Sequence, residues 1–492
     1  MRIVVDLVAF EEFRKKRVLL SELEIAFLRS YLGKTRGPVE MFNLLRNIVR
    51  ISKTSLKLCA LYFVFLFHLS IVFTLKFYQR NAFSFLESCK RNLFLPASYY
   101  FRLFSFKIRY ARLNPVKNHR NILCIVHTLS VGGAQEVMLN IAKGNKGEGF
   151  SFHLTTVSSE HDWRSAFEPY FNNIIIVPKT NESFYHKYFE YIIKRLKIDI
   201  VIITNSVVGY GCLPRLKSMF ENIKIIDLIH EFYEKYDSHV LKNTMFVDRR
   251  ISISNKFRNR LAATYQKYGY PGICTERLMV IHNGIDAKIY NTGLYAKGVF
   301  KNRYSIPQDS KIVSFIGRFS KEKNPLLFVE VAKKVVSRFP TGLKFVMTGY
   351  GPEFDRVKEL IVKSGVENYF VLTGKTENVT DLLADTDILL VVSKLEGIPL
   401  VIMEAMAMGV PVISTDIGGI GELIENNVNG FLINTMSTTD GVTESFSQKI
   451  IEIVTGQIDY CAFSEKARNT IIPRFTLKEM ASRYLVTFEE LI

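Results

Sequence analysis

Residues 121–135 read NILCIVHTLSVGGAQ, and this stretch introduces the pattern that decides the fold. The apolar run 122–126 indicates a short buried strand, Gly132 and Gly133 indicate a turn, and a helical pattern begins at about Ala134. Comparable apolar runs follow along the chain and alternate with amphipathic segments. The runs that predict strands are 200–203, 223–229, 251–254, 278–281, 311–316, 344–347, 370–372, 388–392 and 410–414, and the segments that predict helices include 325–339, 353–364 and 420–426.

This alternation of fully apolar strands with helices is typical of parallel sheets that are covered by helices on both faces. The strands are too numerous for one sheet, and the stretch 286–308 lacks clear periodicity, so we place a domain boundary there. The sequence thus predicts an α/β protein with two doubly wound, Rossmann-like domains at 121–290 and 300–475. A last helix over 476–492 begins with the capping box Thr476-Leu477-Lys478-Glu479, and we expect it to pack back across the domains.

The composition restricts the class of protein. The chain has 492 residues, of which 48% are hydrophobic and 23% are charged, with 28 Gly and 14 Pro. These values exclude a disordered, collagen-like or disulfide-stapled protein and leave enough length for two or three cores. The six cysteines are scattered without a CxxC spacing, so a zinc ribbon is not expected and a reducing compartment is the simplest interpretation.

Positive charge is concentrated in residues 1–120, which we treat as a basic, aromatic and mostly helical N-terminal extension. This part holds 22 Lys/Arg and 7 Asp/Glu, a net charge of +15, and the whole chain carries +18, so only +3 remains for 121–492. A nucleic-acid enzyme with a basic groove through its core is therefore not indicated, and we expect no nucleic acid partner.

The extension contains an apolar run at 58–75, which is 18 residues long and has no formal charge. As a helix it reaches about 27 Å, just short of the ~30 Å hydrocarbon core of a bilayer, so it is either a single membrane span or the core helix of a small helical domain. Residues 76–120 combine ten Lys/Arg with many aromatic side chains, which suits an anionic membrane surface. The periodicity of 102–112 fits a helix and a strand equally. We expect membrane association, peripheral or single-span, at the cytoplasmic face of the cell membrane.

Ligands of doubly wound sheets bind at the carboxyl ends of the strands, and three motifs of this chain lie at such ends. Gly132-Gly133 follows the first strand, allows close approach of a ligand to the backbone, and opens a helix whose N-terminus attracts anions. This pair is not the GxGxxG dinucleotide fingerprint, which argues against an oxidoreductase. Arg318 and Lys323 follow the strand 311–316 and place two cations at one sheet edge.

The third motif, Ser393-Lys394-Leu395-Glu396-Gly397-Ile398-Pro399, follows the strand 388–392 and leads into a helix that contains Glu404. Pro399 suits the first turn of that helix, so Glu396 and Glu404 flank its N-terminus at different heights. Carboxylates accept hydrogen bonds from the hydroxyl groups of a ribose or hexose, whereas phosphate oxygens need the free N–H groups. From the residues alone, a structural helix with an acidic N-terminus is equally compatible.

Together these motifs resemble those of the retaining nucleotide-sugar glycosyltransferases with a GT-B fold, the family 4-like group that is marked by two glutamates separated by seven residues. The resemblance covers about 121–492 and leaves 1–120 outside it. It implies two Rossmann-like domains with a cleft between them and a UDP- or GDP-sugar as donor. The motifs that carry it are the GGAQ turn, His230, Asn283-Gly284-Ile285-Asp286, Gly317-Arg318 with Lys323, Thr348-Gly349-Tyr350-Gly351-Pro352, Glu396 with Glu404, and Gly418-Gly419 with Gly430.

The resemblance implies a role for each residue of the C-terminal site. Arg318 and Lys323 would hold the donor diphosphate and neutralise the charge on the departing nucleoside diphosphate. Glu404 would bind the donor ribose, and Glu396 would lie beside the sugar hydroxyls. The distal phosphate would meet the backbone N–H groups around Ile398, Leu400 and Val401.

The resemblance also implies residues outside that motif. His230 would line the cleft near the anomeric carbon. Gly132 and Gly133 would shape the gap between donor and acceptor, and Gly351 and Gly374 would lie near the base. The residues expected to be catalytic are Glu396, His230, Arg318 and Lys323.

No metal or other cofactor is expected, because two cations and a helix dipole can stabilise a diphosphate leaving group. Asp385-Thr386-Asp387 matches the DxD pattern by which other glycosyltransferases hold a metal. It precedes an apolar strand, however, where Asp commonly ends a helix–strand turn. His127, at the end of the first strand, either faces the cleft or caps the sheet.

The predicted function is metal-independent transfer of a hexose-type sugar, with retention, from a nucleoside diphosphate to a membrane-presented acceptor. We expect this acceptor to be lipid-linked or another glycan, in the biosynthesis of a surface polysaccharide or glycolipid. One alternative is a non-catalytic, membrane-tethered partner protein with a GT-B body. Another is a nucleotide-sugar epimerase, which would convert the donor without any acceptor.

Overall fold

The computed structural model describes residues 95–492 except 159–161, 232–237, 270–276 and 376–377. The chain divides into two compact units, Met1–Ala111 and Arg112–Ile492.

The described part of the first unit, residues 95–111, consists of the helix α6 (Leu95–Arg109) and the start of a turn. Residues 102–109 are therefore helical, which the periodicity alone had left open. The last turn of α6 contains Lys107 and Arg109, and Ile108 between them is exposed. The apolar run 58–75 lies outside the described residues. Within the part of the chain that is described, no helix combines the length and apolar character that a membrane crossing requires.

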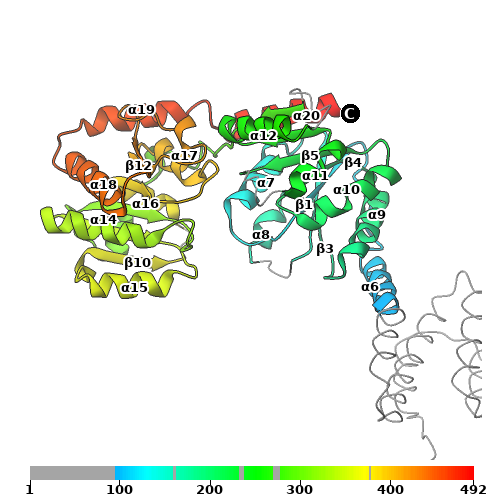
Figure 1. Cartoon of the computed structure of the whole chain (residues 1–492), viewed down its shortest axis with the longest axis horizontal. Coiled ribbons are helices and arrows are strands. Elements are labelled where there is room, and N and C mark those ends of the chain that lie inside the picture. The colour runs from blue at the N-terminus through cyan, green and yellow to red at the C-terminus, as the bar shows by residue number, and fades with distance from the viewer. Residues whose placement is uncertain (1–94, 159–161, 232–237, 270–276, 376–377) are drawn as a thin grey trace, which may run out of the picture. The chain divides into compact units, whose positions relative to one another are not determined.

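The second unit contains two parallel sheets, and helices pack around each of them (Figure 1). In the first sheet, β1 pairs with both β2 and β4, so the strand order β3-β2-β1-β4-β5-β6-β7 extends in both directions from the first strand. The strands are β1 (Arg120–Val126), β2 (Phe150–Thr156), β3 (Asn173–Ile176), β4 (Ile198–Thr204), β5 (Lys224–Ile229), β6 (Arg249–Ser252) and β7 (Leu278–Val280). The α-helices between them are α7 (Gly133–Gly144), α8 (Arg164–Phe167), α9 (Tyr185–Leu196), α10 (Val207–Met219), α11 (Ser238–Lys242) and α12 (Asn255–Lys267).

The second sheet has the order β10-β9-β8-β11-β12-β13, again with its first strand inside the sheet. Its strands are β8 (Lys311–Ile316), β9 (Leu343–Thr348), β10 (Phe370–Gly374), β11 (Ile388–Val391), β12 (Val412–Thr415) and β13 (Phe431–Ile433). The α-helices of this part are α13 (Val299–Arg303), α14 (Pro325–Arg338), α15 (Phe354–Lys363), α16 (Val379–Asp385), α17 (Leu400–Ala407), α18 (Thr439–Val454) and α19 (Tyr460–Ile471). The predicted class, two doubly wound α/β sheets, is confirmed.

Three strands were not predicted, namely β2, β3 and β13. In β2, Ser151, His153 and Thr155 alternate with apolar residues and yet are buried. The His153 ring bonds to Asn121 Oδ1 at 3.1 Å and to Asn173 Nδ2 at 2.9 Å, and burial lowers the pKa of His153 to about 4. The buried ring of His153 is thus satisfied by side chains of the two neighbouring strands, which no local pattern reveals.

The helix predicted at 420–426 is wrong. Only Ile420–Glu422 is helical, as a single 3₁₀ turn. Beyond it the backbone N–H of Glu425 donates to Asn429 Oδ1 at 2.8 Å, and Asn427 has a φ of 62°. The two asparagines stabilise a turn in place of a continued helix.

The last helix, α20 (Leu477–Leu491), packs on the first sheet although the preceding helix α19 follows the second. The backbone N–H of Leu477 donates to the carbonyl oxygen of Ile285 at 2.7 Å, and the Phe488 ring lies 5.3 Å from that of Phe150. Thr476 caps the helix as predicted, since its hydroxyl accepts from the N–H of Glu479 at 3.2 Å.

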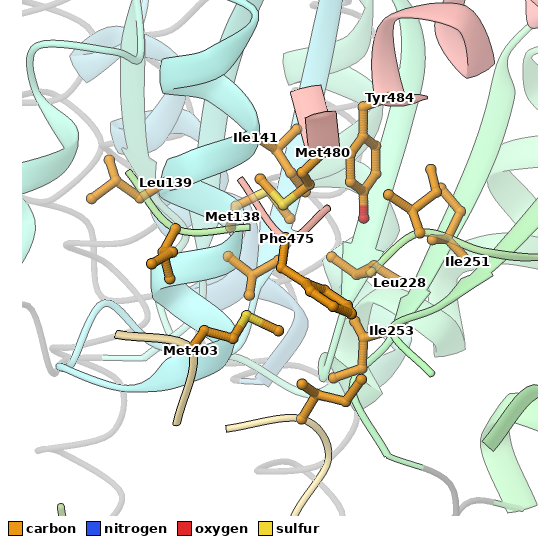
Figure 2. Packing of buried hydrophobic residues seen from close by; sticks show 14 of the residues in the cluster. Met138, Leu139, Ile141, Leu228, Ile251, Ile253, Met403, Phe475, Met480 and Tyr484 are labelled. Atoms are coloured by element: carbon orange, nitrogen blue, oxygen red, sulfur yellow. The ribbon is translucent and has the colours of Figure 1, made fainter. Parts of the chain in front are cut away.

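One cluster of buried apolar residues includes members from both sheets. Figure 2 shows part of it, with Phe475 from the segment before α20, Met480 from α20 itself, Met138 from α7 and Met403 from α17. The end of the chain therefore helps to join the two sheets through their cores.

Candidate active site

The predicted cations, Arg318 and Lys323, and the predicted carboxylate, Glu396, lie in the loops that follow two neighbouring strands of the second sheet. β8 and β11 are paired in parallel, so the loops that follow them leave the same edge of the sheet. The N–H of Lys394 donates to the carbonyl oxygen of Glu322 at 2.7 Å, which joins the two loops directly. This pairing explains how residues about 70 positions apart in the sequence form one cluster.

Lys323 and Glu396 form the centre of this cluster. The Lys323 ammonium lies 2.6 Å from Glu396 Oε1 and 2.7 Å from Oε2. The Ser393 hydroxyl donates to Glu396 Oε1 at 2.6 Å. The Glu396 side chain is 7% exposed and that of Lys323 33%, so the carboxylate is held inside while the cation reaches the surface. Arg318, on the same loop as Lys323, is exposed.

Glycines fix the loop that carries Arg318 against the loop after β9. A Cβ on Gly349 would collide with the carbonyl oxygen of Gly317, and one on Gly351 would collide with the backbone of Phe319. The N–H of Gly349 also donates to the carbonyl oxygen of Gly374 at 2.9 Å. The predicted role of Gly351 and Gly374 near the base stays a prediction.

The helix α17 begins beside Glu396, at Leu400. Pro399 is its N-cap, one position before the first turn in which we expected it. Ile398, Leu400 and Val401 therefore bracket the helix N-terminus, where N–H groups lack partners within the helix. That these groups meet a phosphate stays a prediction.

Glu404 lies one turn further along α17 and is buried. Burial, followed by the charge of Glu136, raises the pKa of Glu404 to about 8, although a hydrogen bond from the Tyr290 hydroxyl opposes the shift. The protonated form is therefore favoured at pH 7 in the donor-free protein. A protonated carboxyl both donates and accepts, so it can still bind ribose hydroxyls.

Tyr290 and Glu136 were not predicted as site residues. Glu136 lies in the first turn of α7, and burial raises its pKa while the Lys143 charge opposes this. Burial, then the charges of Glu404 and Glu136, raise the pKa of Tyr290 as well. The three residues come from segments far apart in the sequence, and no local signal marks Tyr290 or Glu136 as a neighbour of Glu404.

His230 follows β5 in the first sheet and is 9% exposed. Burial lowers the pKa of its imidazole to about 4, so the ring is neutral at pH 7. Its Nε2 is buried without a hydrogen-bond partner among the described residues. A Cβ on Gly397 would collide with the His230 carbonyl oxygen, which puts this histidine against the residue that follows Glu396.

The remaining predicted positions lie at the start of the first sheet. Gly132 is the N-cap of α7 in an extended conformation, and Gly133 is the exposed first residue of the helix. His127 is exposed, and its carbonyl oxygen accepts from Thr156 Oγ1 at 2.8 Å. No described contact joins these residues to the Lys323–Glu396 pair, and their role toward a ligand stays a prediction.

The aspartates of the DxD sequence make structural contacts. Asp385 accepts from the N–H groups of Gly298 and Lys301, at 2.5 and 3.0 Å. Asp387 bonds to the Lys311 ammonium at 3.0 Å and to the N–H of Ile312 at 2.9 Å. Each carboxylate thus anchors a neighbouring segment.

A second contact between the sheets was not predicted. Asn255 and Lys256 are the first two residues of α12. The Glu422 carboxylate accepts a hydrogen bond from the backbone N–H group of each, at 3.0 Å. It also accepts from the Asn255 side chain at 2.9 Å and lies 2.8 Å from His282 Nε2. A carboxylate from the segment after β12 therefore binds the N-terminus of α12, which packs with the first sheet.

Two family descriptions match this chain. Residues 131–289 match glycosyltransferase family 4, and residues 297–470 match glycosyl transferases group 1. The two matches together take in about two thirds of the chain and, except for β1, all strands of the two sheets.

Several known proteins are similar. The N-acetyl-alpha-D-glucosaminyl L-malate synthase of Bacillus anthracis is 30% identical over 215 residues, which are 44% of this chain and 54% of that protein. The UDP-Gal:alpha-D-GlcNAc-diphosphoundecaprenol alpha-1,3-galactosyltransferase of Escherichia coli is 24% identical over 298 residues, or 58% of this chain and 74% of the relative. The match thus spans about half the length of the first relative and about three quarters of the second.

Among solved structures, Anabaena Alr3699/HepE in complex with UDP-glucose aligns with a TM-score of 0.62 and 18% identity, over 76% of this chain and all of that one. At this identity the similarity concerns the fold. On the family matches and the paired parallel sheets, the chain belongs to the GT-B glycosyltransferases of the family 4 and group 1 type.

Proposed function

We propose that the protein transfers a sugar from a UDP-sugar or GDP-sugar donor to a glycan acceptor. The observation that carries this proposal is the cluster of Lys323, Glu396 and Ser393 beside the N-terminus of α17. It combines a surface-reaching cation, a buried carboxylate and a helix N-terminus at one strand edge, which are the groups that a diphosphate joined to a sugar needs.

In this proposal Lys323 and Arg318 bind the diphosphate together with the N–H groups of Ile398, Leu400 and Val401. Their charge stabilises the leaving nucleoside diphosphate as its bond to the anomeric carbon breaks, and no metal ion is required for this. Glu404 binds the ribose, and Glu396 accepts from hydroxyl groups of the sugar. His230, neutral because of its burial, contributes a polar atom beside the Glu396 loop without adding positive charge.

We further propose that the sugar is transferred with retention, through attack on the face from which the diphosphate departs. The transition state then has oxocarbenium character, and the departing phosphate takes the acceptor's proton. NMR analysis of the first-formed product tests this point, because an inverted anomeric configuration contradicts it.

The acceptor is proposed to be lipid-linked and presented at the cytoplasmic face of the membrane. The name of the Escherichia coli relative states a diphosphoundecaprenol acceptor, and the extension of this chain contains α6, which has Lys107 and Arg109 beside the exposed Ile108. Sedimentation of the full chain with vesicles tests the membrane contact. Binding to vesicles with anionic lipid, but not to neutral vesicles, is expected.

A thermal-shift panel of nucleoside diphosphates and their sugars tests the donor site, because a ligand that binds the folded state raises the melting temperature. Release of free nucleoside diphosphate from the best donor then measures turnover. Lys323→Ala and Glu396→Gln are expected to abolish most of it, and Lys321→Ala, which removes an exposed cation of the same loop, should not.

The outcomes separate the alternatives. A non-catalytic partner protein would show no turnover that Glu396→Gln removes. An epimerase would give a new nucleotide sugar without any acceptor. Absence of a thermal shift with every donor contradicts the proposal itself.

A further inference from the structure

The loop after β11 contains a buried serine for which the motif analysis gave no role. Ser393 is 3% exposed, and its hydroxyl donates to Glu396 Oε1 at 2.6 Å. The backbone of Ser393 is fixed as well, because its carbonyl oxygen accepts from Thr415 Oγ1 at 2.8 Å, at the end of the neighbouring strand β12. The backbone that carries this hydroxyl is therefore fixed between the end of β11 and the end of β12.

Glu396 has two partners that differ in their freedom to move. Lys323 contacts both carboxylate oxygens, but its side chain is one-third exposed and its ammonium group sits at the end of a flexible aliphatic chain. Ser393 contacts one oxygen only, from a buried position with a short side chain. A ligand that competes for the cation can move Lys323, whereas Ser393 stays in the loop.

A diphosphate is such a ligand, because it carries more negative charge than one carboxylate and attracts an ammonium group more strongly. Once Lys323 turns to the diphosphate, Glu396 loses the partner of its second oxygen. The remaining hydrogen bond then determines where the carboxylate points.

On the basis of the proposed function, we propose that Ser393 is a positioning residue. It retains Glu396 Oε1 when the donor engages Lys323, so that Oε2 is directed at a hydroxyl group of the donor sugar. Ser393 itself does not touch the donor. Its removal affects binding of the sugar part and leaves binding of the nucleotide part intact.

The first test compares ligands with and without the sugar. Titration calorimetry measures binding of UDP-glucose and UDP, with GDP-mannose and GDP as the second pair, to wild type and Ser393→Ala. We expect the affinity for the nucleotide sugar to fall about tenfold, as for loss of a hydrogen bond to a charged group, and that for the free nucleotide to change less than twofold. An equal loss for both ligands, or no loss for either, overturns the inference.

The second test is a double-mutant cycle with Glu396→Gln, measured on donor turnover. If Ser393 acts through Glu396, then Ser393→Ala has little further effect in the Glu396→Gln background. Independent, multiplicative effects contradict the inference. A purely structural serine would lower stability in both backgrounds and would not give this pattern.

Matched variants keep the test interpretable. Ser447→Ala removes another buried hydroxyl of the same half of the chain, one that donates to the carbonyl oxygen of Glu444 at 2.9 Å, and should change neither binding nor turnover. If Ser393→Ala does not fold, Ser393→Cys, which has similar volume and a weak donor, is expected to show the same selective loss. Wild-type protein that binds neither ligand pair contradicts the proposed function, whereas active wild type with an unaltered Ser393→Ala contradicts only this inference.

Discussion

The contact of Glu422 with α12 allows a quantitative prediction about stability. The first N–H groups of a helix have no hydrogen-bond acceptor within the helix. In α12 the acceptors are two side chains, one from the segment after β6 and one from the segment after β12. Ser254, the N-cap, accepts from the N–H of Phe257 at 3.2 Å, and Glu422 accepts from those of Asn255 and Lys256. Removing Glu422 therefore leaves two donors at the helix start without their present acceptor and breaks a link between the sheets.

The magnitude follows from these contacts. Loss of a capping side chain costs roughly 0.5–2 kcal/mol, and loss of a negative charge at a helix N-terminus costs roughly 0.3–1 kcal/mol. We expect Glu422→Ala to lower the free energy of unfolding by about 1–3 kcal/mol. Glu422→Gln keeps one acceptor oxygen but loses the charge, so about 1–2 kcal/mol is expected.

The carboxylate also predicts a pH dependence. Burial alone would raise the pKa of Glu422, but hydrogen bonds from His282, Asn255 and Lys256 outweigh it and lower the value to about 2, from 4.5 in the unfolded chain. Stabilisation by Glu422 is thus fully present above pH 4.5 and is lost as the pH falls toward 2. The difference in stability between wild type and Glu422→Gln should shrink over this range.

Urea unfolding followed by circular dichroism measures both effects, because a change in midpoint at constant slope reports stability. Glu425→Gln is the matched control, since Glu425 lies in the same segment but is exposed. If Glu422→Gln and Glu425→Gln differ from wild type by the same amount at pH 7, the contact does not stabilise the fold and the reasoning is refuted.

Three further predictions concern the candidate site. Lys323→Ala should lower donor turnover by about 10²–10³-fold, measured by release of nucleoside diphosphate, whereas Lys321→Ala should not; equal effects would remove Lys323 from the diphosphate site. Because burial raises the pKa of Glu404 from 4.5 to about 8, the folded state binds a proton that the unfolded state releases, and stability falls as the pH rises through this window. The melting temperature of Glu404→Gln, relative to that of wild type, should therefore rise as the pH is raised from 5 to 8.5. A difference in melting temperature that stays constant over this range would contradict the raised pKa of Glu404. Gly397→Ala should lower the stability by about 1–3 kcal/mol in urea unfolding, since its Cβ would collide with the His230 carbonyl oxygen; wild-type stability would mean that the two segments do not touch.

Much of the fold could be predicted because its strands are buried on both faces. The predicted run 311–316 coincides with β8, and the predicted helix 325–339 differs from α14 by one residue. In β2, by contrast, buried polar residues interrupt the apolar pattern, and the partners of one of them, His153, lie on the two neighbouring strands. A pattern read along the chain detects burial only where the buried residues are apolar.

The candidate site shows the same division. The sequence marked Arg318, Lys323, Glu396 and Glu404, because strand ends and a helix start are visible locally. It could not reveal that Lys323 bonds to both oxygens of Glu396, since that contact depends on the pairing of β8 with β11.

By itself, then, the sequence determined the two-sheet architecture and the polar residues at the strand ends, because both depend on the local alternation of apolar strands, turns and helices. Only the tertiary structure decided which of these groups meet. Three contacts join atoms whose approach is set by sheet pairing and core packing. They are the hydrogen bond of Ser393 to Glu396, that of Tyr290 to Glu404, and the binding of Glu422 to the N-terminus of α12. Hydrogen bonds and burial act over a few ångströms in space, and separation along the chain carries no information about them.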